Sequence, residues 1–409
     1  MKTLPFKPKQ QDILKRTCIL LILIISFVAI IIQPTYTYCA NNSLIETTEG
    51  LEQSVSDILR DVDFTEIEEK IAEFDANQVK MFSLGNIRGK VQDIINGKQA
   101  VDYATMLEVI IDVLMQLIVQ YVPMFALIIG IGIIASLLGQ MKSKFNEKST
   151  SDIVHFVCFC LIVVVMATSV KRLIASTTST IGGMQSTINV IFPIILTLMT
   201  SLGEVSSVSV FQPILAIMSM IISTVIFKVI VPIFIFSFVL NVIGHLSNNI
   251  KLDKFNSFLS SLFKWVIGIT FTIFFAVISI QGITAGSFDS VSLRTAKFTV
   301  SSYVPIMGGY LSQGMDLIMA SGVLIKNSIG LVGILIIISS ILSPILEIAI
   351  FSLMLKAVSA ILQPLNNNRI TNFLNSSSKN VTMLSTCIIA VSFMYFLCIG
   401  MCMASANVI

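Results

Sequence analysis

Charged residues are scarce in this chain, and their scarcity decides its class. Only 12% of the 409 residues are Asp, Glu, Lys or Arg, whereas 55% are hydrophobic and the mean hydropathy is +0.90. A soluble domain carries about a quarter of its residues as charged ones. Because lipid offers no hydrogen-bond partner to the backbone, the embedded part must be helical. We therefore expect an all-α polytopic integral membrane protein.

Histidine is nearly absent, and the common catalytic motifs are missing. His155 and His245 are the only two histidines, which argues against a histidine-based metal centre. The sequence has no CxxC pair, no HExxH motif and no GxxxxGK[ST] phosphate loop. We therefore expect no metal, no cofactor and no enzymatic activity.

The N-terminus reads as a targeting segment. A basic stretch that includes Lys15 and Arg16 precedes an apolar run from Cys18 to Ile32, and a polar exit with small residues follows. This pattern predicts a Sec-type signal peptide over residues 1–39, with an uncleaved anchor as the alternative. Both interpretations place the following segment outside the cytoplasm.

Residues 40–105 form the one region that is polar enough to be soluble. Between Asn41 and Asp112 there are 15 acidic and 6 basic residues. Apolar stripes predict two helices, the second of which would begin at a capping box formed by Thr65 and Glu68. This acidic helical extracytoplasmic region is either a cover for the membrane domain or a docking surface for another protein. The candidate docking residues are Glu66, Glu68, Glu69 and Glu73.

The membrane domain, residues 106–409, contains a repeat. Three apolar segments begin at Pro123, Pro232 and Pro344, run into a polar basic linker, and continue as a second apolar run of spanning length. We interpret them as three copies of one helical hairpin, at about 121–170, 229–283 and 344–404, which gives six firm spans. If the hairpins are parallel, their basic linkers share one side, and the positive-inside rule makes that side the cytoplasm.

The segments between the hairpins also recur. Pro193 precedes Pro232 by 39 residues, and Pro305 precedes Pro344 by the same interval. Residues 188–202 and 304–320 are short and polar, so we expect up to four further spans or re-entrant segments here. The same offset aligns Glu204 with Asp316, although chance matching in apolar sequence is the alternative.

Several charges lie at membrane depth. Such charges usually face a bundle interior or a water-filled cavity, but long side chains also reach the interface by snorkelling. Arg294 and Lys297 lie three residues apart and so share one helix face. The candidate pathway or assembly residues are Arg294, Lys297, Asp316, Lys326, Glu204, Glu347 and Lys356.

The run SLRTAKFTVSSYVPIMGGYLSQGMDLIMASGVLIKNSIGLVG resembles the signature region of the stage III sporulation protein AE family. Its most specific pieces are Arg294 to Phe298, Val304-Pro305 and Leu324 to Asn327. The resemblance extends over most of the chain, although the acidic region matches only in character.

The resemblance implies a role in sporulation. It implies a multi-pass protein of the mother-cell membrane around the forespore, acting with the other stage III sporulation proteins AA to AH and a forespore partner. Together these would form a hetero-oligomeric, channel-like, secretion-like complex in the membrane lipid, without nucleic acid. The family offers no catalytic residues to carry over. The alternative function is that of a free-standing secondary transporter.

Overall fold

The computed structural model describes residues 45–141, 148–246, 252–303, 308–365 and 368–404, so the predicted signal peptide lies outside the described residues. Within these ranges the chain is almost entirely helical and has no strand. Four short helices come first: α2 (Ile45–Asp61), α3 (Thr65–Ala72), α4 (Ala76–Phe82) and α5 (Ile87–Ile95). The long helices follow: α6 (Tyr103–Met141), α7 (Lys148–Ser201), α8 (Val205–Val225), α9 (Val231–Leu246), α10 (Asp253–Tyr303), α11 (Gly308–Leu362) and α12 (Asn368–Ala404).

Six helical segments of the described chain are long and apolar enough to cross a membrane. They are α6, α7, α8 continued by α9, α10, α11 and α12. A π-helical turn, Ile226–Ile230, joins α8 to α9 just before Pro232 and absorbs the backbone disturbance that a proline causes. The class predicted from the sequence, an all-α polytopic membrane protein, is confirmed.

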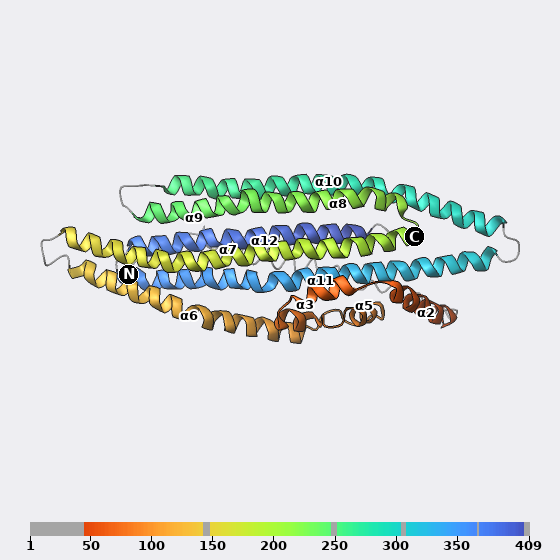
Figure 1. Cartoon of the computed structure of the whole chain (residues 1–409), viewed down its shortest axis with the longest axis horizontal. Coiled ribbons are helices and arrows are strands. Elements are labelled where there is room, and N and C mark those ends of the chain that lie inside the picture. The colour runs from red at the N-terminus through yellow and green to blue at the C-terminus, as the bar shows by residue number, and fades with distance from the viewer. Residues whose placement is uncertain (1–44, 142–147, 247–251, 304–307, 366–367, 405–409) are drawn as a thin grey trace, which may run out of the picture.

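The three predicted hairpins are present as the pairs α6/α7, α9/α10 and α11/α12. The ends of the paired helices gather at one end of the bundle, on the left of Figure 1. We call this the linker end. That the linker end faces the cytoplasm remains a prediction from the basic residues near it.

Helices α11 and α12 form the centre of the bundle. In their most apolar windows 67% and 61% of the residues are buried, against 22% in α6 and 11% in α10. Side chains bond α12 to its neighbours: Asn241 of α9 donates to the Ser377 hydroxyl at 2.9 Å, and Ser352 of α11 donates to the Ser378 carbonyl at 3.2 Å. A Cβ on Gly333 would lie 2.7 Å from Ile191, so glycine permits the close approach of α7 and α11.

The polar segments between the hairpins are continuations of long helices rather than separate elements. Residues 188–201 are the last turns of α7, and residues 308–320 are the first turns of α11. The sequence suggested re-entrant elements because these segments are rich in Ser and Thr. In α7, however, hydroxyls such as those of Thr187 and Thr197 donate to the carbonyl four residues earlier, so the helix itself satisfies them. The turn into α8 requires Gly203, whose φ is +85°.

Helices this long extend beyond a bilayer. Helix α7 has 54 residues, or about 80 Å, whereas the hydrocarbon core is about 30 Å thick. The exposed surface of α7 changes along its length. Between Ile153 and Val164 every described exposed side chain is apolar, whereas from Ala167 to Ser201 the exposed ones are Ala, Pro, Ser, Thr, Asn, Lys and Arg. The change falls about 30 Å from the start of the helix.

Helix α6 changes at the same level. Its exposed side chains from Val122 to Leu138 are all apolar, whereas Glu108, Asp112, Gln116 and Gln120 are exposed before that. Tyr121 lies about 30 Å from the linker end of α6. The two helices therefore predict that the bilayer surrounds the linker-end half of the bundle, and that the remainder stands outside it.

The N-terminal helices cover that outer half. Helices α2 and α5 pack on α11, α3 packs on α7, and α4 packs on α6 and α11. Their apolar faces, which include Val55, Ile67 and Val91, are buried. There are four short helices between Ile45 and Ile95 where the sequence suggested two. The capping box predicted at Thr65 is wrong, because α3 lacks a side-chain cap and the box lies at Asp75 and Gln78 of α4.

The continuity of α7 gives a direct prediction. In a cysteine-free protein in lipid nanodiscs, spin labels at Ile153 and Thr200 should lie about 70 Å apart, because an α-helix rises about 1.5 Å per residue. Pulsed electron resonance measures this distance. Labels at Ile153 and Ser179 serve as the control and should lie about 39 Å apart. A distance below about 45 Å for the first pair would mean that α7 folds back as a re-entrant element.

Candidate functional site

An ion pair links three helices at the level where their surfaces change. The Arg172 guanidinium of α7 donates to the Glu347 carboxylate of α11 through Nη2 at 2.8 Å and Nε at 3.2 Å. The Tyr121 hydroxyl of α6 donates to the same Glu347 oxygen at 2.8 Å and accepts from Arg172 at 2.8 Å. The guanidinium also lies over the Tyr121 ring, 4.9 Å from its centroid. The geometry satisfies the carboxylate with two charge-assisted bonds and one neutral bond.

The pair is buried unequally. The Glu347 side chain is 12% exposed and the Arg172 side chain is 46% exposed. With its amide oxygen turned toward the guanidinium, Gln120 accepts from Arg172 Nη1 at 2.8 Å. The acid is therefore enclosed between helices, while the base faces a polar surface. We call Gln120, Tyr121, Arg172 and Glu347 the boundary cluster.

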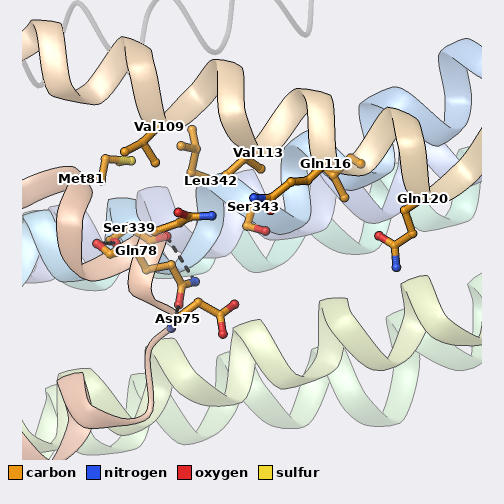
Figure 2. Close-up of a pocket in the computed structure, with 12 residues that line it drawn as sticks. Asp75, Gln78, Met81, Val109, Val113, Gln116, Gln120, Ser339, Leu342 and Ser343 are labelled. Atoms are coloured by element: carbon orange, nitrogen blue, oxygen red, sulfur yellow. Dashed lines mark hydrogen bonds between the residues drawn. The ribbon is translucent and has the colours of Figure 1, made fainter.

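A polar pocket leads toward the boundary cluster from the outer half. Figure 2 shows it beneath α4, between α6 and α11, with Gln78, Gln116 and Gln120 among its lining residues. The Ser339 hydroxyl donates to the Gln78 carbonyl at 2.6 Å and so attaches α4 to the middle of α11. The cavity measures about 120 Å³, which is room for several water molecules. Water and small polar groups can therefore reach the ion pair from outside.

A second buried charge lies farther along α11. Lys326 is fully buried, and its Nζ has no hydrogen-bond partner among the described residues. The nearest fields come from the Glu204 carboxylate, itself 5% exposed, and from the Cys402 thiol. An ammonium enclosed without a hydrogen bond is unfavourable. Lys326 is thus a residue that a purely structural role does not explain.

The remaining predicted residues are dispersed. Asp316 is exposed on α11, unlike Glu204, so the two aligned acids have different surroundings. Lys356 is half-buried, and the nearby Lys379 repels it. The side chains of Arg294 and Lys297 lie outside the described residues, although their backbone belongs to α10. The proposed docking residues Glu66, Glu68, Glu69 and Glu73 are exposed on or beside α3.

Sequence reasoning found Glu347 but missed its partners. It assigned Arg172 to the outside surface and gave Tyr121 no role. Counting residues from the hairpin linkers could have found the pair, because Glu347 and Arg172 lie at comparable depths on antiparallel helices. Among the described residues, no three His, Cys, Asp or Glu side chains converge to hold a metal ion. The cluster is suited to holding helices in register and to binding polar groups.

A polytopic α-helical membrane protein with buried charges at one level is the class that the fold defines. The profile of the family described as Stage III sporulation protein AE matches residues 86–406, so the chain belongs to that family. Stage III sporulation protein AE of Bacillus subtilis (strain 168) is 24% identical over 320 residues, which covers 78% of this chain and 80% of the relative. No solved structure matches. Helices α2 to α4 precede the matched region.

Breaking the ion pair should destabilise the bundle. Arg172→Met leaves the mostly buried Glu347 carboxylate without its cation and should cost about 2 kcal/mol of stability. Glu347→Gln in the same chain should recover part of this loss, because the uncompensated charge is then gone. Thermal unfolding of the purified protein in detergent measures the effect.

The control is Lys171→Met, which removes an exposed charge from the adjacent position and should change stability by less than about 0.5 kcal/mol. If Arg172→Met shifts the unfolding temperature no more than Lys171→Met does, the ion pair does not hold the helices.

Proposed function

We propose that this protein is a non-enzymatic membrane component of a sporulation channel that links the mother cell to the forespore. Family membership supports a sporulation role, and the six apolar helical segments of the described chain support a multi-pass membrane protein. In this proposal the protein resides in the mother-cell membrane around the forespore. It acts there within a hetero-oligomer of the stage III sporulation proteins AA to AH and a forespore partner.

The observation that carries the proposal is an apolar surface that the bilayer level does not account for. On α6 and α7 the exposed apolar surface ends near Tyr121 and Val164, whereas on α8 and α10 it includes Ile217, Met220 and Ile280. Figure 1 shows that the α9/α10 hairpin begins farther along the bundle than the α6/α7 hairpin. These side chains therefore lie beyond the polar level of α6 and α7. Contiguous apolar surface outside lipid marks a protein contact, which favours a subunit of an assembly.

A free-standing secondary transporter is the second candidate. The repeated hairpins, the prolines within helices and the pocket that leads to Arg172 and Glu347 favour it. The two candidates differ in a measurable way. A transporter moves its solute when it is the only protein in a liposome, whereas a channel subunit needs its neighbours.

The candidate residues have distinct roles under the proposal. Arg294, Lys297 and Asp316 belong to the signature region and would contact the pathway or another subunit. Glu204 and Lys326 would form an internal charged pair whose geometry changes on assembly. Glu347 would hold the boundary cluster, and Lys356 would reach the membrane surface near the linker end.

The apolar surface of α8 gives the test. Changing Ile217→Ser, Met220→Gln and Ile221→Ser together should leave the amount of protein in the membrane unchanged. It should lower recovery of the other stage III sporulation proteins in a pull-down, and the spore yield, by at least about tenfold, because a contact core is removed. Immunoblots of membrane fractions and spore counts measure both.

The matched control changes exposed polar positions on the same helix, Ser206→Gln, Ser209→Gln and Gln212→Ser. It should leave recovery and spore yield unchanged. Full recovery of partners with the apolar triple variant would contradict the proposal. Loss of the protein itself from the membrane would also contradict it, because it would show that this surface faces lipid.

A further inference from the structure

A groove lies at the outer end of the bundle, separate from the boundary cluster. The end of α2 and the start of α3 form one wall, the last turns of α7 form the floor, and Ile318 and Gly322 of α11 close the other side. Its volume is about 580 Å³, within the range of pockets that enclose drug-sized ligands. A Cβ on Gly322 would lie 2.4 Å from Leu202, so glycine allows α11 to approach the end of α7 here.

The rim of the groove is acidic. Asp61, Asp63 and Glu66 line it and are exposed. The Asp63 carboxylate accepts from the Thr65 hydroxyl at 2.6 Å and from the Thr65 N–H at 2.9 Å. These two bonds hold the pKa of Asp63 below its ordinary value, so the group is ionised at neutral pH. Among the described ion pairs none involves any of the three carboxylates.

One basic residue lies near this rim but leaves most of its charge unbalanced. Arg88 of α5 donates to the Val62 carbonyl at 3.4 Å, and its guanidinium lies over the Phe64 ring, 5.7 Å from the centroid. It is therefore held against the backbone and an aromatic face rather than in an ion pair with the rim. Three carboxylates remain against one guanidinium.

The floor of the groove is apolar. Val190, Ile194 and Leu198 of α7 face it, together with Pro193. Because proline has no N–H, the Asn189 carbonyl cannot receive its usual helical hydrogen bond from residue 193. The floor thus combines aliphatic side chains with a backbone carbonyl that is free of one helical donor.

The groove lies well outside the bilayer. Residues 190 to 202 of α7 are about 63 to 80 Å from the start of that helix, measured along its axis. The exposed face of α7 becomes polar about 30 Å from the same point. An occupant therefore comes from the extracytoplasmic space and not from the lipid core. Anionic lipid headgroups are disfavoured as well, since they would meet the three carboxylates.

We propose that this groove binds a short basic and apolar segment of another extracytoplasmic protein, with Lys or Arg side chains against Asp61, Asp63 and Glu66 and aliphatic side chains on Ile194 and Leu198. The proposal goes beyond membership of a channel and holds whether the protein acts in an assembly or alone. It also separates Glu66 from Glu68, Glu69 and Glu73, which are not among the residues that line the groove.

The test uses the full chain in nanodiscs of zwitterionic lipid and two fluorescent eight-residue peptides, one of alternating leucine and lysine and one of alternating leucine and glutamate. Empty nanodiscs supply the background. Fluorescence anisotropy should show that the lysine peptide binds at least about tenfold more tightly than the glutamate peptide, because only the former matches the rim. Absence of this preference would overturn the proposal.

Two matched pairs of variants locate the binding. The rim variant Asp61→Asn, Asp63→Asn and Glu66→Gln should weaken binding of the lysine peptide at least about tenfold. The control variant Glu68→Gln, Glu69→Gln and Glu73→Gln removes the same number of charges and should leave the affinity within about twofold. Equal weakening by both variants would mean a diffuse acidic field and would overturn the proposal.

A steric pair tests the groove without changing its charge. Ser201→Trp places an indole in the groove and should weaken binding of the lysine peptide at least about tenfold. Thr200→Trp places the same group in the separate cavity between α7 and α8 and should leave the affinity unchanged. Unchanged affinity with Ser201→Trp would show that the peptide binds elsewhere.

Discussion

The length of the helices is the constraint on which the rest of the structure depends. Helices α7, α10 and α11 each exceed 50 residues, and a bilayer accommodates about 20 residues of a helix that crosses it directly. Each long helix must therefore pass from lipid into another environment without interrupting its backbone hydrogen bonds. The protein achieves this by changing side chains along an unbroken helix. The outer half is stabilised by the covering helices α2 to α5, whose apolar faces pack on it.

The boundary cluster lies at this transition and explains why charges are tolerated there. At this level Arg172 has access to a polar surface while Glu347 is enclosed between helices, so the pair is neither fully in lipid nor fully in water. Tyr121 supplies the third helix and the third hydrogen bond. Removing one member exposes the cost of the others, which is the behaviour expected of a partly buried pair. Lys326 has no such compensation among the described residues, and this contrast makes it the stronger candidate for a role beyond packing.

Sequence reasoning predicted the fold class well because lipid restricts the backbone to a few solutions. Scarce charge and long apolar runs indicated helices, and the repeated prolines and basic linkers indicated three hairpins. It was less successful where polarity within a helix resembles a loop. Thr187 and Thr197 bond to their own helix, so a hydroxyl-rich segment did not require a re-entrant element. It could not pair Glu347 with Arg172, because the pairing depends on which faces of α7 and α11 meet. It also listed four glutamates as one docking surface, of which only Glu66 borders the outer groove.

The central claim is that α7 leaves the bilayer near Thr168 and continues outside it. The most direct test is the accessibility of single spin labels on its exposed face, in lipid, to oxygen and to a water-soluble nickel complex. Labels at Ile153, Val157, Leu161 and Val164 should be accessible to oxygen and shielded from nickel. Labels at Ala175, Ser179 and Thr197 should be accessible to nickel, with the transition near Thr168. Shielding from nickel that continues to Thr197 would place the whole helix in lipid and contradict the account.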